Sequence, residues 1–158
     1  MFETIVWATD GSELADSALP LVTELARAFG SKIVAVHANE VFRGGRYAGG
    51  PLLADEDEIQ IKIAAQVDDL RDAGFATANL KIETSDRHGT AQLIAEAAAQ
   101  FRADLIVLGT HGNGTIATGA LGGVITRGLL NVAPCPVLAV PALHDRAAHA
   151  EPRQAVPA

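Results

Sequence analysis

Residues 103–112 read Ala-Asp-Leu-Ile-Val-Leu-Gly-Thr-His-Gly. The four apolar residues from Leu105 to Leu108 follow one another without a polar residue, as is typical of a strand that helices cover on both faces of a parallel sheet. Glycine follows at once, so the backbone can turn sharply and approach a ligand closely where the strand ends. This stretch predicts a fold class and also the edge of the sheet where a binding site belongs.

The rest of the chain repeats this pattern. Apolar runs rich in Val and Ile occupy residues 4–8, 32–38, 104–108 and 136–140, and a weaker alternating run occupies residues 78–84. The stretches between them have the apolar spacing of amphipathic helices and are too long for hairpins, so the sheet should be parallel with right-handed crossovers. We expect an α/β fold: one doubly wound domain over residues 1–141, followed by a flexible tail at 142–158.

The first helical pattern contains a proline. Pro20 should either kink the helix or shift its start, and we favour a tolerated kink. The predicted buried stripe of this helix consists of Leu14, Ala18, Leu21, Leu25 and Phe29. The acidic run at residues 55–58 is expected to stabilise the start of the second helix by opposing its dipole.

Composition excludes several classes of function. The 158 residues include 12 Lys and Arg against 19 Asp and Glu, a net charge of −7 that repels nucleic acid and anionic lipid. One cysteine, Cys135, excludes an internal disulfide and a site of several thiolates. Glu3 stands where a signal peptide would be basic, and Asp10 ends the first apolar stretch. We therefore expect a soluble cytoplasmic protein that binds neither nucleic acid nor membrane.

Residues 108–126 carry the chemistry. This segment is rich in glycine and runs into the start of the last predicted helix, where unpaired backbone amides and the helix dipole favour an anion such as phosphate. No lysine follows the glycines, so the segment is not a P-loop, and the first strand is not followed by Gly-x-Gly-x-x-Gly. A flexible connection that binds nothing is the alternative.

The spacing Gly109-x2-Gly112-x9-Gly122 resembles the nucleotide signature of the universal stress protein family, Gly-x2-Gly-x9-Gly-[Ser/Thr]. Residues 5–12, 103–109 and 133–138 resemble three further blocks of that family, so the resemblance covers roughly residues 3–140. It implies a five-stranded parallel sheet of order 3-2-1-4-5 with helices on both faces. It also implies an adenine-nucleotide site and homodimers.

The resemblance further implies which residues bind the nucleotide. Asp10 would face the ribose or adenine, Leu108 would contact the sugar, and main-chain groups of the glycines would hold the phosphates. The implied set is Ala8, Thr9, Asp10, Val36, His37, Ala38, Leu108, Gly109, His111, Gly112, Gly122, Gly123 and Val124. We expect no catalytic residue and no metal site, although a bound nucleotide could bring Mg²⁺ with it.

Gly123 departs from the family pattern, because it stands where the signature has Ser or Thr. A hydrogen bond to a charged acceptor contributes about 1.5–3 kcal/mol, or about one to two decades of affinity. A strong preference for triphosphate is therefore not expected, and ATP, ADP, AMP and cyclic AMP are all candidate ligands. Thr126, one helical turn on, is a candidate replacement for the missing hydroxyl.

Three of the singled-out residues have structural alternatives. Asp10 also suits a turn or helix cap ahead of Ser12. His37 also suits a pocket wall or the core, and Cys135 reads as a buried small residue rather than a nucleophile.

Together these features predict a nucleotide-binding regulatory protein of the stress response, in which ligand occupancy alters dimerisation or partner choice. A slow ATPase ranks lower, because no lysine and no carboxylate accompany the glycines. A ligand-free dimeric scaffold of the same fold is the other alternative. The homodimer is expected to form through the last strand, Pro136 to Val140, which would pair with its twin.

Overall fold

Five parallel strands form the centre of the protein in its computed structural model, which describes residues 2–40, 56–84, 87–110 and 123–141. The strands are β1 (Thr4–Thr9), β2 (Lys32–Glu40), β3 (Thr77–Thr84), β4 (Leu105–Gly109) and β5 (Val137–Val140). Their order is β3-β2-β1-β4-β5, and every neighbouring pair is parallel. The predicted fold class and strand order are confirmed.

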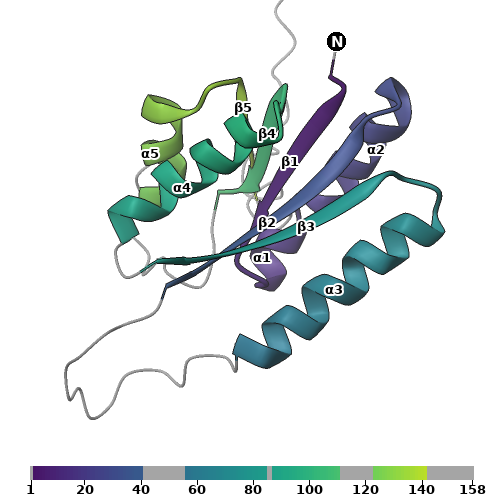
Figure 1. Ribbon diagram of the computed structural model, residues 1–158, viewed down its shortest axis with the longest axis horizontal. Coiled ribbons are helices and arrows are strands. Elements are labelled where there is room, and N and C mark those ends of the chain that lie inside the picture. Colours follow the sequence, from purple (N-terminus) through teal and green to yellow (C-terminus); the bar gives the residue numbers. More distant parts are fainter. Residues whose placement is uncertain (1, 41–55, 85–86, 111–122, 142–158) are drawn as a thin grey trace, which may run out of the picture.

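The helices are α1 (Glu13–Asp16), α2 (Leu19–Phe29), α3 (Glu56–Asp72), α4 (Arg87–Gln100) and α5 (Val124–Val132). Helices α2 and α3 cover one face of the sheet, and α4 and α5 cover the other (Figure 1). The connection from β2 to β3 runs through α3, and the connection from β3 to β4 runs through α4. The domain is therefore doubly wound, with its core in two layers.

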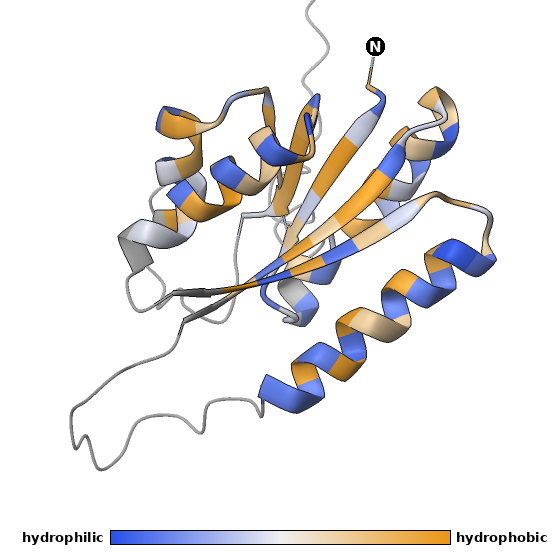
Figure 2. Ribbon diagram, in the orientation of Figure 1, coloured by the Kyte–Doolittle hydropathy of each residue, from blue (hydrophilic) through white to orange (hydrophobic). Residues whose placement is uncertain are grey.

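The central strand β1 shows why the apolar runs are continuous. Ile5 and Trp7 are fully buried against α2 and α3, whereas Val6 and Ala8 are buried on the side of α4 and α5. Successive side chains of a strand point to opposite faces, so a strand covered on both faces has apolar residues at every position. Figure 2 shows apolar colours along much of the middle of the sheet, with pale segments between them.

The preference for a kinked first helix was wrong. The chain forms two helices: α1 ends at Asp16, and α2 begins at Leu19 with Pro20 in its first turn. Proline is tolerated there because its missing N–H would have no partner inside the helix. Ala18 of the predicted stripe is fully buried, but the buried face continues through Val22 and Ala26, which the stripe did not include, and Phe29 is 40% exposed.

Apolar residues of the described strands pack into the two layers of the core. No described helix is both long enough and apolar enough to cross a bilayer. The predicted tail at residues 142–158 lies outside the described part of the chain.

Candidate functional site

The carboxyl ends of β1, β2 and β4 lie side by side at one edge of the sheet. In the register of the strands, Ala8 pairs with Val36 on one side and with Leu108 on the other, and Thr9 pairs with His37. The strand order reverses between β1 and β4, which is where ligands of open α/β sheets bind. The structure thus brings together predicted site residues at the ends of β1, β2 and β4.

The turn after β1 is held by its own side chains. Oδ1 of Asp10 accepts hydrogen bonds from the Ser12 amide at 3.0 Å and from the Ser12 hydroxyl at 2.6 Å. The Gly11 amide donates to the Thr9 hydroxyl at 3.1 Å, and the Ser12 hydroxyl accepts from the Ala15 amide as the N-cap of α1. Asp10 is therefore a turn residue, as its structural alternative stated, and its contact with a nucleotide stays a prediction.

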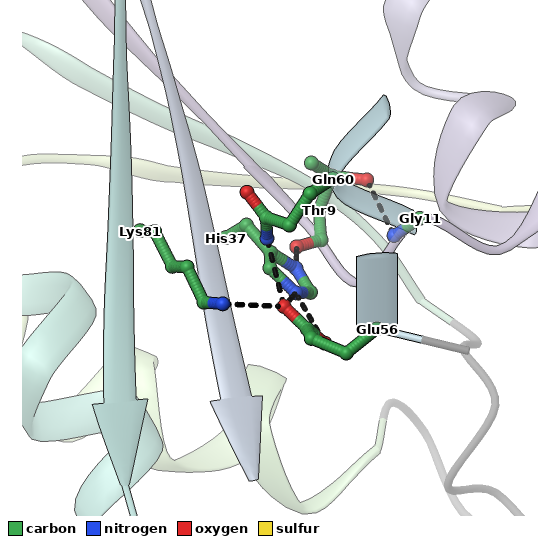
Figure 3. A network of polar contacts seen from close by, with 6 residues as sticks. All are labelled: Thr9, Gly11, His37, Glu56, Gln60 and Lys81. Carbon is green, nitrogen blue, oxygen red and sulfur yellow. Dashed lines mark hydrogen bonds and ion pairs between the residues drawn. The ribbon is translucent and has the colours of Figure 1, made fainter. Parts of the chain in front are cut away.

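His37 is buried in the second half of β2 and connects three elements (Figure 3). Its Nδ1 lies 3.0 Å from the carbonyl oxygen of Thr9 on β1, and its Nε2 lies 3.3 Å from Oε1 of Glu56 on α3. The two ring nitrogens thus connect a backbone carbonyl on one side of His37 with a carboxylate on the other. This arrangement matches the expectation of a core residue, and a role of His37 toward a ligand stays a prediction.

Glu56 is the residue of this network that the sequence did not reveal. Burial raises its pKa, but hydrogen bonds from Gln60 at 2.8 Å and from Lys81, together with the charge of His37, outweigh burial and lower the pKa below its ordinary value. The Lys81 ammonium lies 3.2 Å from Oε1 of Glu56. The only sequence signal was an acidic residue at the start of a helix, which the dipole explains equally well.

On the other side of the site, α5 begins without a side-chain cap. Its N-cap residue is Gly123, whose amide donates to the carbonyl of Thr110 at 3.2 Å. The amide of Thr110 in turn donates to the carbonyl of Val140. A phosphate would therefore compete with Thr110 for the Gly123 amide, whereas amides of the first turn, from Val124 on, lack acceptors within the helix. Thr126 is buried, and its contact with phosphate stays a prediction.

The comparison with protein families decides the identity of the domain. The sequence model of the universal stress protein family matches residues 1–141 of this chain. The chain belongs to the universal stress protein family. A universal stress protein of Thermus aquaticus is 33% identical over 142 residues, which cover 89% of this chain and 99% of the relative.

Solved structures of universal stress proteins share this fold. One is a universal stress protein in complex with cAMP, with a TM-score of 0.64 and 22% identity, over 89% of this chain and 98% of that one. Another is the universal stress protein of Archaeoglobus fulgidus in complex with dAMP, with a TM-score of 0.60, 22% identity and the same coverage of both chains. At these identities the similarity is one of fold.

The family's nucleotide signature is only partly within the described residues of this universal stress protein. Gly109 ends β4 and Gly123 precedes α5, whereas His111, Gly112 and Gly122 lie outside the described residues. Among the residues that the structure describes, no group of three or more His, Cys, Asp and Glu side chains could hold a metal ion.

Proposed function

We propose that this universal stress protein binds an adenine nucleotide at the carboxyl ends of β1, β2 and β4, and that occupancy of the site regulates its interactions in the stress response. The observation that carries the proposal is the register of the sheet. It aligns Ala8 with Val36 and Leu108, directly before the β1 turn and the glycine segment, at the point where the strand order reverses.

The proposed site has two halves. Asp10 and the ends of β1 and β2 form the nucleoside half, and Leu108 is its sugar contact. Main-chain groups of Gly109, Gly112, Gly122, Gly123 and Val124 form the phosphate half, where the N-terminus of α5 favours an anion. Any Mg²⁺ would arrive with the phosphates.

The relatives support an adenine ligand with few phosphates. The ligands of the two solved complexes, cAMP and dAMP, each carry one adenine and one phosphate. Gly123 offers no hydroxyl to a longer phosphate chain. We therefore propose AMP or cyclic AMP as the better ligands, with ADP and ATP as weaker ones.

Native mass spectrometry and calorimetry test this function. Freshly purified protein should retain a nucleotide, and Gly112→Val and Gly122→Val should abolish binding because a side chain blocks the approach of phosphate to the backbone. Urea unfolding, followed by fluorescence of the fully buried Trp7, shows whether the fold is retained. Unchanged affinity in both folded variants would overturn the proposal.

One substitution tests the phosphate half directly. Gly123→Ser restores the hydroxyl of the family signature and should tighten ATP more than AMP, by up to about one to two decades. Equal changes for the two ligands would show that the hydroxyl does not reach the distal phosphates.

The proposed partner is a second copy of the chain, paired through Pro136 to Val140. Strand β5 is at the edge of the sheet, and Leu130 and Val132 on the neighbouring α5 are 65% and 43% exposed. The carbonyls of Pro136 and Val140 bond toward β4, so by the alternation of a strand the backbone of Ala139 faces the open edge.

Ala139→Pro removes one outward-facing amide and should convert the dimer to a monomer in light scattering coupled to size-exclusion chromatography. Nucleotide affinity, measured in parallel, shows whether the site survives the change. A wild-type protein that is monomeric at all concentrations would overturn the proposed homodimer.

A further inference from the structure

Lys62, in the second turn of α3, reaches the segment that follows β1. Its Nζ donates to the carbonyl oxygen of Gly11 at 2.7 Å and forms an ion pair with Oδ2 of Asp16 at 2.5 Å. Gly11 precedes α1 and Asp16 ends it, so one ammonium group binds both ends of this segment. The Lys62 side chain is 39% exposed, which leaves its contacts only partly screened by solvent.

The same helix also packs closely on Gly11. A Cβ atom placed on Gly11 would lie 2.6 Å from Cγ2 of Ile59, and Gly11 has a φ of +74°. The backbone of the turn therefore has little room to move away from α3.

The Gly11–Ser12 peptide group links Lys62 to Asp10. Its carbonyl accepts from Lys62, and its N–H, which belongs to Ser12, donates to Oδ1 of Asp10 at 3.0 Å. A peptide group is planar and rigid, so rotating it away from Lys62 would also break the contact with Asp10. The position of the carboxylate consequently depends on a lysine of another helix.

We propose that Lys62 is a positioning residue for the nucleoside half of the site. By holding the Gly11–Ser12 peptide plane, it holds the Asp10 carboxylate where the base or ribose meets it. This inference rests on the proposed function. A lysine beside an anion site can also bind phosphate directly, but the Lys62 ammonium is bound to a carbonyl and a carboxylate of the segment that follows β1, which favours positioning.

Calorimetry with adenosine, AMP and ATP separates the two roles. Lys62→Met should weaken all three ligands by the same factor, roughly threefold to tenfold, and Lys62→Arg should restore most of the affinity. Lys32→Met is the matched control, because it removes the same charge near Phe101 at the amino end of the sheet and should change nothing. A loss that grows with the number of phosphates, or no loss at all, would overturn the positioning role.

Amide hydrogen exchange of the ligand-free protein tests the positioning without any nucleotide. In Lys62→Met the Ser12 amide should exchange several-fold faster, while the core amide of Val34 exchanges at its original rate. In the Lys32→Met control the exchange rate of the Ser12 amide should not change. Unchanged exchange at Ser12 in Lys62→Met would overturn the inference. If the unaltered protein binds none of the three ligands, the proposed function fails, and faster exchange at Ser12 still supports the positioning of the turn by Lys62.

Discussion

The turn after β1 and the start of α5 lie at the carboxyl ends of two neighbouring strands, β1 and β4, yet they are held in different ways. In the turn, side chains make the contacts: Asp10 binds Ser12, and Lys62 binds the Gly11 carbonyl from α3. At the start of α5, Gly123 has no side chain, and its amide donates to the backbone carbonyl of Thr110. One half of the proposed site is positioned by polar side chains, the other by backbone and helix packing.

This difference predicts different sensitivities. A network that includes charged side chains is weakened when one of those charges is removed, by substitution or by a change of pH. A backbone site is disturbed mainly when the helix that carries it shifts, since its amides have no side chain to readjust. The substitutions below separate these two cases, from the largest expected effect to the smallest.

Gly11→Ala should destabilise the protein most, by about 2–5 kcal/mol. A positive φ costs a residue with a Cβ about 1–2 kcal/mol, and the close contact with Ile59 adds about 1–3 kcal/mol. Gly30→Ala is the matched control, because Gly30 has a φ of +68° and nothing within 4 Å of its Cβ position. Equal losses in urea unfolding for both variants would show that packing of the turn against α3 contributes nothing.

Gly128→Ala tests the packing that places α5. Its new Cβ would lie 2.7 Å from Cβ of Ala91 on α4, so the helices must separate. Overpacking of about 1–3 kcal/mol outweighs a gain in helix propensity of about 1 kcal/mol, and phosphate-dependent affinity should fall.

The rescue is Ala91→Gly in the same chain. The double-mutant cycle should show a favourable coupling of about 1 kcal/mol or more, measured by denaturant unfolding. Additive single and double effects would contradict the contact as the cause.

Glu56→Gln tests the polar side of the comparison through pH. The pKa of Glu56 in the folded protein is below its ordinary value of 4.5, so ionised Glu56 stabilises the fold above that pH. This stabilisation is lost as the pH falls through the lower, folded pKa. The variant should therefore be less stable than the wild type at pH 7, by at most about 1 kcal/mol, and the difference should shrink in acid.

Denaturant unfolding at several pH values measures this difference. A constant gap between the two proteins from pH 7 to below pH 4 would show that the charge of Glu56 is not what stabilises the network around His37.

The amino end of the sheet serves as a reference away from the site, with the smallest expected effect. Burial, and then the charge of Asp104, raise the pKa of the Cys135 thiol. Asp104→Asn removes the charge and should raise the rate of Cys135 alkylation by iodoacetamide roughly twofold near pH 8. Nucleotide should leave this rate unchanged, and a change would place the ligand elsewhere than at the carboxyl ends of the strands.

Much of the fold could be predicted from the sequence because local patterns carry it. Continuous apolar runs such as Leu105 to Leu108 occur where both faces of a strand are covered, and their alternation with helical patterns leaves few topologies. The family resemblance supplied the strand order. The split at Pro20 was missed, because a kink and a new helix start have the same sequence signal.

The candidate site was predictable in part. Glycine spacing and the ends of apolar runs pointed to the carboxyl ends of the strands, and the register of β1 with β2 and β4 brings the ends of three of those runs together. The contacts of Glu56 and Lys62 were not predictable, because the partners His37 and Gly11 are 19 and 51 positions away along the chain. No local pattern encodes a pairing between side chains that meet only after the sheet has formed.

The sequence by itself determined the alternation of strands and helices, since burial on both faces demands apolar residues at every strand position. It also determined where glycine leaves the backbone bare. Only the tertiary structure decided that α3 holds the turn after β1 through Lys62 and Ile59, and that α4 seats α5 at Gly128. Such contacts depend on how helices pack across the sheet, which is set by the whole core rather than by neighbours in the chain.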